Sequence, residues 1–68
     1  MDFNLKEGEY IKLGQLLKAC NIASSGLEAK IIISEGKVLV NDEICTMRGK
    51  KIYRGDKINT ENEEVHII

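Results

Sequence analysis

Hydrophobic residues recur at helical spacing in the first third of the chain. The positions i, i+3, i+4 and i+7 of one stretch are occupied by Leu13, Leu16, Leu17 and Cys20. Residues at this spacing lie on one face of an α-helix. The pattern therefore predicts a first helix over about residues 13–20, with Asn21 at its end.

A second helix is predicted from a start signal. Ser25 and Glu28 fit a capping box, in which the serine hydroxyl accepts from the Glu28 amide while the Glu28 side chain reaches back. An apolar stripe begins at Ala29, and Gly36 supplies a C-terminal stop. The β-branched run at residues 31–33 lowers helix propensity, so we expect this helix to depend on packing.

The pattern changes after Gly36 to short stretches that are typical of strands. Residues 38–40 predict a short buried strand, and Asn41 and Asp42 predict a turn, because both residue types tolerate left-handed conformations. Phe3 and Leu5 alternate with polar residues, as in an edge strand. Further strands are expected over residues 43–45, 57–59 and 65–68, with an exposed basic loop over residues 46–55 and a turn at residues 55–56.

Length and composition limit the classes of protein to consider. A chain of 68 residues has room for one domain, which buries roughly 60% of its unfolded surface. Its 43% hydrophobic and 31% charged residues argue against disorder, and no apolar run reaches membrane-spanning length. Two cysteines, Cys20 and Cys45, form no CxxC motif and are too few for a typical secreted disulfide scaffold. We expect a cytoplasmic protein without an export or anchor signal.

Charge is distributed unevenly along the chain. The net charge is −1, which by itself does not favour a nucleic-acid partner. Residues 30–57, however, hold seven basic and four acidic side chains, a local balance of +3, which leaves −4 for the remainder. Part of the negative charge is close to the C-terminus, at Glu61, Glu63 and Glu64. A basic face can therefore coexist with an acidic edge.

Four segments carry a resemblance to a known family. They are residues 12–20, residues 24–30, the stretch EGKVLVND at residues 35–42, and GDKI at residues 55–58. Read in order, they resemble the S-four RNA-binding domain over about residues 11–58, and the short chain resembles its stand-alone bacterial YaaA/YbcJ-type members. The resemblance implies a single α+β domain over residues 1–68, in which two N-terminal helices pack on a small, curled, mostly antiparallel sheet, the αL RNA-binding motif.

Two positions depart from the family pattern. Gly26 stands where many members have an arginine near RNA phosphate, and Asp42 replaces the common glycine after Asn41. Gly26 allows close backbone approach, so the helix start at Ser25 and Gly26 could present amide donors to a phosphate. A simple helix cap is an equally supported interpretation.

The basic loop is the best candidate for RNA contact, because each cation that neutralises a phosphate releases counterions. Its cations are Arg48, Lys50, Lys51 and Arg54. The resemblance places this loop near the second helix, where Lys30 and Lys37 would extend the basic patch. The alternative is a solvated charged loop.

Other polar and aromatic residues carry weaker signals. Asn41 could contact RNA, although asparagine after a strand is more often part of a turn. The aromatic residues Phe3, Tyr10 and Tyr53 are too few and too dispersed for a stacking platform. Tyr53 alone could stack on a base, but we expect it to pack in the core. The expected target is therefore structured RNA, recognised by shape and phosphate position.

Catalysis is not predicted. The single histidine, His66, has no partner at metal-ligand or catalytic spacing, and no phosphate-binding or dinucleotide motif occurs. We expect no cofactor, metal, small-molecule substrate or membrane partner, and a monomer that binds structured RNA, in particular ribosomal RNA or ribosomal particles. The alternative is a protein-interaction adaptor that uses the acidic C-terminal segment and an exposed sheet edge.

Overall fold

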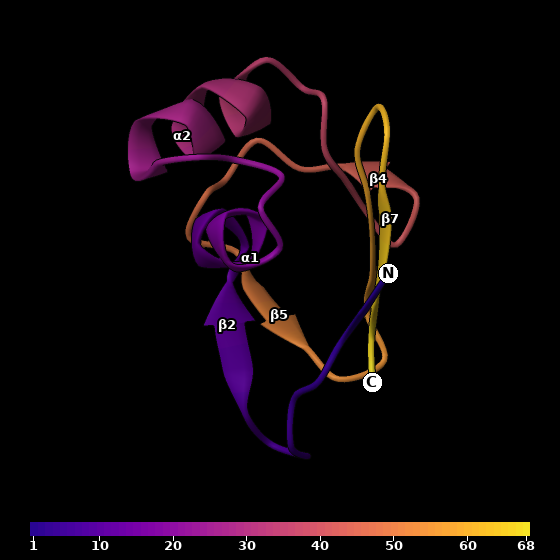
Figure 1. Cartoon of the computed structure of the whole chain (residues 1–68). Helices are drawn as coiled ribbons and strands as arrows, with labels where there is room; N and C mark the ends of the chain where they lie inside the picture. Colours follow the sequence, from indigo (N-terminus) through magenta and orange to yellow (C-terminus); the bar gives the residue numbers. More distant parts are fainter.

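The computed structural model describes residues 1–68, which form two helices and seven short strands (Figure 1). In chain order the elements are β1 (Asp2–Phe3), β2 (Tyr10–Lys12), α1 (Leu13–Ala19), α2 (Gly26–Ser34), β3 (Leu39–Val40), β4 (Glu43–Ile44), β5 (Lys51–Tyr53), β6 (Lys57–Asn59) and β7 (Glu64–Ile67). This arrangement confirms the predicted α+β class.

A five-stranded sheet forms one layer of the molecule. Its strand order is β1-β7-β6-β3-β4, and only the pairing of β1 with β7 is parallel. Both helices lie on the same side of this sheet (Figure 1). The N- and C-termini lie close together, because β1 and β7 are neighbouring strands of the sheet. The predicted edge strand near Phe3 and the predicted strands over residues 57–59 and 65–68 are thus present; the last two pair with each other, and β7 covers Glu64–Ile67.

A separate two-stranded ribbon joins β2 to β5 in antiparallel register. The prediction of an exposed loop over residues 46–55 is therefore wrong for residues 51–53. Ile52 lies opposite Ile11 and is fully buried, whereas Tyr53 is exposed, so the prediction that Tyr53 packs in the core is also wrong. The physical reason is strand alternation, which turns Ile52 inward and its two neighbours outward.

The first helix follows its sequence pattern closely. Leu13, Leu16 and Leu17 are fully buried, and Cys20 forms the half-buried C-cap. Asn21 has a φ of 58°, a left-handed conformation that asparagine adopts more readily than most residues. The helix therefore ends where the sequence predicts.

The second helix has only half of the predicted capping box. The Ser25 hydroxyl accepts from the Glu28 amide at 3.1 Å, as predicted. The Glu28 carboxylate, however, accepts from the Ser24 hydroxyl at 2.7 Å and does not reach back to Ser25. A hydroxyl one residue earlier competes for the same carboxylate, and the cap is formed by both serines.

One hydrophobic cluster links the helices to both sheets. Its twelve buried members are Leu13, Leu16, Leu17, Ala23, Ala29, Ile33, Val38, Val40, Ile52, Ile58, Val65 and Ile67. All twelve are apolar, so the buried interior carries no charged side chain. Neither helix has the length and apolar composition required to cross a membrane.

Candidate nucleic-acid interface

A groove of about 370 Å³ lies where the two helices meet the loop over residues 46–50. We call it the basic groove. Its lining residues are Lys12, Gly14, Gln15, Lys18, Gly26, Ala29, Lys30, Arg48 and Gly49. Four of these nine residues are cations and none is acidic. The groove is therefore positively charged although the whole protein carries −1.

Backbone contacts hold the loop against the start of α1. The Leu13 amide donates to the Lys50 carbonyl oxygen at 2.9 Å, and the Gly14 amide donates to the Arg48 carbonyl oxygen at the same distance. These two amides belong to the first helical turn, where no intrahelical acceptor exists. A Cβ at Gly14 would lie 3.5 Å from Arg48, so the absence of a side chain there leaves room in the groove. Arg48 is thereby fixed beside α1.

The start of α2 forms another wall of the groove. Gly26 is the first residue of this nine-residue helix, and a Cβ at this position would meet nothing within 4 Å. The backbone at Gly26 is thus open to a ligand at the positive end of the helix dipole. Lys30 lies one turn further along the same helix. The predicted residues Ser25, Gly26, Lys30 and Arg48 are consequently brought to one region.

The structure divides the remaining predicted cations. Lys50 and Lys51 line a second groove of about 520 Å³, which lies between β4 and β5 and also contains Ile44, Met47 and Tyr53. Arg54 is exposed in the turn that follows β5. These three cations therefore surround the ribbon and do not line the basic groove.

Two cations of the basic groove were missed by the sequence prediction. Lys12 precedes α1 directly, and Lys18 lies within it, both exposed. Together with Gln15 they recur every three residues, which is the polar side of the helix opposite its leucines. This spacing in the sequence could have identified Lys12 and Lys18 as members of one exposed helix face.

Lys37 is not brought to the basic groove. Its Nζ lies 3.4 Å from a Glu35 carboxylate oxygen and 3.5 Å from one of Glu61. Glu35, and after it Glu61, raises the pKa of Lys37. The residue lies beyond the C-terminus of α2 in a third, polar depression that includes Glu63. The predicted extension of the basic patch to Lys37 therefore does not form, because the acidic C-terminal segment folds back onto this lysine.

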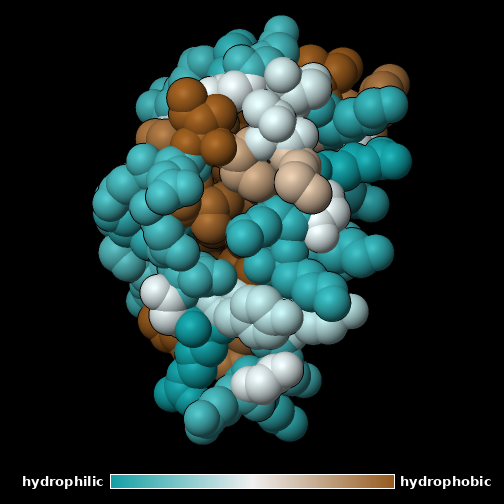
Figure 2. Space-filling model, turned by 180° about the vertical axis from the view of Figure 1, so that it is seen from behind, coloured by the Kyte–Doolittle hydropathy of each residue, from teal (hydrophilic) through white to brown (hydrophobic).

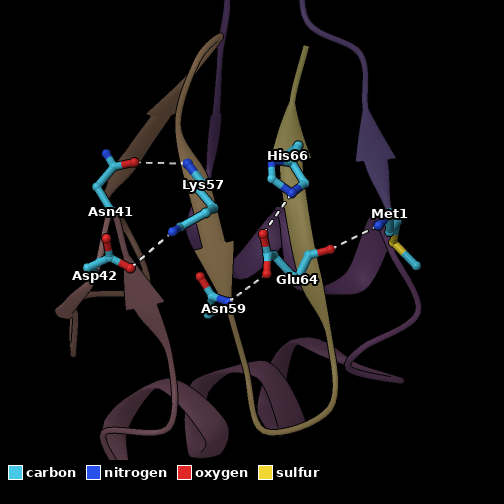
Figure 3. Close-up of polar contacts among 7 residues, drawn as sticks. All are labelled: Met1, Asn41, Asp42, Lys57, Asn59, Glu64 and His66. Atoms are coloured by element: carbon cyan, nitrogen blue, oxygen red, sulfur yellow. Dashed lines mark hydrogen bonds and ion pairs between the residues drawn. The ribbon is translucent and has the colours of Figure 1, made fainter.

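Asn41 acts as a structural link between two turns. Its side-chain oxygen accepts from the Lys57 amide at 2.9 Å (Figure 3), and its side-chain nitrogen donates to Asp56 at 3.0 Å. Asn41 and Asp42 have φ values of 51° and 70°, which confirms the predicted turn. Both polar atoms of the Asn41 side chain are occupied, which favours the turn interpretation over RNA contact.

The outer face of the five-stranded sheet carries polar and ionic contacts (Figure 3). The Lys57 ammonium lies 3.1 Å from Asp42, and His66 Nε2 lies 2.7 Å from the Glu64 carboxylate. His66 is thus exposed on this face. The basic partners in the ion pairs of the structure are only Lys37, Lys57 and His66. The four cations of the basic groove are therefore uncompensated by neighbouring carboxylates.

Cys20 is not a poised nucleophile. Burial, and after it the charge of Glu63, raises the pKa of this thiol, while the N-terminal amine acts in the opposite direction. A raised pKa keeps the thiol protonated, and the thiolate is the reactive form. Both cysteines are free and half-buried.

Comparisons with known proteins show which family the chain resembles. The family model described as S4 domain matches residues 3–68. A Bacillus subtilis (strain 168) protein described as a probable ribosome maturation protein, RlbA, is 49% identical over 53 residues, or 78% of this chain and 75% of that protein. YbcJ of Escherichia coli (strain K12) is 32% identical over 66 residues, or 97% of this chain and 94% of that protein.

A solved structure extends the similarity to three dimensions. The solution structure of YbcJ from E. coli matches with a TM-score of 0.75 at 31% identity, and the match covers 98% of this chain and 85% of that one. That structure is described as revealing an αL motif involved in RNA binding.

Proposed function

The chain belongs to the S4 domain family, and from that membership we propose that it binds structured RNA, without catalysis, through the basic groove. The observation that carries the proposal is the set of four unpaired cations between the two helices and the loop over residues 46–50. Cations that lack a carboxylate partner in the protein are available to neutralise phosphates, and each such contact releases counterions.

The proposed interface has an inner and an outer part. The inner part is the basic groove, with Lys12, Lys18, Lys30 and Arg48 as phosphate partners and the backbone at Gly26 as a donor beside the Ser25 hydroxyl. The outer part consists of Lys50, Lys51 and Arg54. Lys37 and Asn41 are left out, because other groups of the protein already engage them: two glutamates pair with Lys37, and the Asp56 side chain and the Lys57 backbone amide bind the Asn41 side chain. In this proposal residues 1–68 act as one S4 unit, with residues 11–58 as the RNA-binding αL motif.

Ribosomal RNA is the proposed target. The support comes from RlbA, whose description as a ribosome maturation protein accompanies 49% identity to this chain. The groove suits structured RNA in particular, because its lining contains no aromatic side chain and offers cations at phosphates instead. We accordingly propose a ribosome-associated or RNA-handling accessory role, with the protein acting as a monomer.

Ultraviolet crosslinking in cells, followed by sequencing of the bound RNA, tests the proposal. We expect ribosomal RNA fragments to be enriched, and the enrichment to be lost in the quadruple variant Lys12→Gln, Lys18→Gln, Lys30→Gln and Arg48→Gln. Retained solubility and a native circular dichroism spectrum are required of the variant. Absence of crosslinked RNA from the wild-type protein would contradict RNA binding, and enrichment of RNA other than ribosomal would contradict the target.

The second candidate is the protein-interaction adaptor. It is favoured by the edge position of β4, where Ile44 and the following Met47 are 66% and 67% exposed. Figure 2 also shows hydrophobic side chains exposed among mostly hydrophilic ones in the upper half of the face that it draws. Affinity purification before and after ribonuclease treatment separates the candidates: partners that persist unchanged favour the adaptor, and loss of all partners favours RNA.

A further inference from the structure

The β2–β5 ribbon has one buried and one exposed face. Its register places Tyr10 opposite Tyr53, Ile11 opposite Ile52, and Lys12 opposite Lys51. Because successive side chains of a strand point to opposite faces, the two isoleucines share the face toward the core. The two tyrosines and the two lysines share the other face, and all four of them are exposed.

The tyrosines form an aromatic pair at the surface. Their ring centroids lie 5.9 Å apart with an interplanar angle of 51°, and the Lys51 ammonium lies 4.9 Å from the centroid of Tyr10. Tyr10 is 47% exposed and Tyr53 is 44% exposed. The expectation of dispersed aromatic residues is therefore wrong for this pair, because strand pairing joins positions far apart in the sequence. Two aromatic rings held open to solvent offer a surface on which another ring can stack.

The two lysines are an unfavourable pair for the ribbon alone. Like charges directly opposite each other on an antiparallel pair are destabilising. Neither Lys12 nor Lys51 takes part in an ion pair, so no carboxylate relieves the repulsion. An anion that binds between them would relieve it.

The ribbon continues the basic groove. Lys12 lines that groove and also belongs to the exposed face of the ribbon, since β2 runs directly into α1 (Figure 1). Moving away from α1 along the ribbon, the Lys12–Lys51 pair is followed by the Tyr10–Tyr53 pair. A pair of cations and a pair of aromatic rings thus lie next to each other on one continuous surface, and proteins that bind single-stranded nucleic acid combine the same two kinds of contact.

We propose that the exposed face of the β2–β5 ribbon is a stacking subsite for an unpaired nucleotide that adjoins the structured RNA in the basic groove. The base stacks on the tyrosine pair, and the adjoining phosphate lies between Lys12 and Lys51. This inference rests on the proposed function and deepens it. It makes the preferred ligand a helix that ends in, or is interrupted by, unpaired nucleotides.

Five synthetic RNA hairpins with the same stem test the subsite. One is blunt. Two carry three unpaired nucleotides, one at the 5′ end and one at the 3′ end, and the remaining two carry the same extensions with abasic residues. We expect one of the base-containing extensions to tighten binding by roughly fivefold or more over the blunt hairpin, as for stacking of a single base. The abasic extension should give only a minor part of this gain.

Paired variants assign the gain to the tyrosines. The double variant Tyr10→Val and Tyr53→Val keeps residues suited to strands. In this variant the affinity for the base-containing extended hairpin, divided by the affinity for the blunt hairpin, should fall to about one. The double variant with phenylalanine at both positions should retain the gain. Because Tyr10 and Tyr53 are the two tyrosines of the chain, labelling with 3-fluorotyrosine gives two ¹⁹F signals, which should shift with the extended hairpin and not with the abasic one.

The outcomes separate this inference from the proposed function. Equal affinity of the wild-type protein for the blunt and extended hairpins, or a gain that the abasic extension reproduces, would overturn the stacking subsite alone. A gain that survives the valine substitutions would also overturn it. Failure to bind any of the hairpins would overturn the proposed function together with the subsite.

Discussion

The backbone amide of Gly14 donates a hydrogen bond to the carbonyl oxygen of Arg48 at 2.9 Å. This contact fastens the loop over residues 46–50 to the first turn of α1, so Arg48 faces the same groove as Lys30 from α2. The cations of the groove therefore come from three separate parts of the chain. Their convergence depends on backbone contacts and not on neighbouring positions in the sequence.

Neutralising one groove cation should weaken RNA binding. Lys30→Gln and Arg48→Gln should each raise the Kd for a structured RNA hairpin, with a loss of about 1.5 kcal/mol, or roughly tenfold, for one charged hydrogen bond to phosphate. Fluorescence anisotropy at constant salt measures the change. Lys37→Gln is the matched control, because it changes the net charge equally and its ammonium is already paired with two glutamates.

If Lys37→Gln weakened binding as much as Arg48→Gln, net charge and not the groove would determine affinity. Equal losses of affinity in Lys37→Gln and Arg48→Gln would therefore contradict the proposed position of the interface.

Ile52→Ala should cost the domain a large part of its stability. Ile52 is fully buried in the core, and such a truncation costs about 2–5 kcal/mol. Ile44→Ala, at a position that is 66% exposed, should cost less than about 1 kcal/mol, in line with exposed surface positions. Urea unfolding followed by circular dichroism gives both values. Equal costs would mean that residues 51–53 are the exposed loop that the sequence suggested.

Asn41→Ala should destabilise the protein without changing its RNA affinity. The substitution removes two side-chain hydrogen bonds, each of about 1 kcal/mol, and places alanine at a φ of 51°. Asn41→Gly should be less destabilising, since glycine adopts this φ freely. Thermal unfolding and anisotropy would be measured on the same samples. Weaker binding by a folded Asn41→Ala protein would restore Asn41 to the interface.

The Cys20 thiol should make stability fall at alkaline pH. Its pKa is raised in the folded protein, mainly by burial, so the folded state holds this proton more tightly than the unfolded state. The stabilising contribution is therefore present below the ordinary thiol pKa and is lost as pH rises through the raised value. Cys20→Ala should show a flatter decline than the wild-type protein in urea titrations at increasing pH.

Alkylation gives a second readout of the same thiol. In a Cys45→Ser background, iodoacetamide should modify Cys20 more slowly in the folded protein than in urea at the same pH, because less thiolate is present. Equal rates would contradict the raised pKa.

The helices could be predicted from the sequence because their signals are local. The leucine spacing of α1 and the Ser25 cap of α2 lie within single turns, and both elements form where those signals indicate. The β2–β5 ribbon could not be predicted in the same way. Its strands have three residues each, and only pairing across the chain reveals that Ile52 points inward.

The candidate site was predictable in part for a similar reason. The family resemblance places the loop containing Arg48 near the second helix, and the structure brings Arg48 and Lys30 to one groove. Lys12 and Lys18 were missed because their charges lie outside the basic segment of the sequence. Lys37 was included in the patch because its long-range partner, Glu61, cannot be identified from local spacing.

The salt dependence of RNA binding tests the central claim most directly. The Kd of the wild-type protein for a structured ribosomal RNA hairpin would be measured over a series of salt concentrations, beside the quadruple groove variant described above. We predict a steep loss of wild-type affinity with salt, and a logarithmic slope that is smaller in the variant by about one unit for each groove cation removed. Salt-independent binding by the wild-type protein, or an unchanged slope in the folded variant, would contradict the claim that the basic groove binds RNA phosphates.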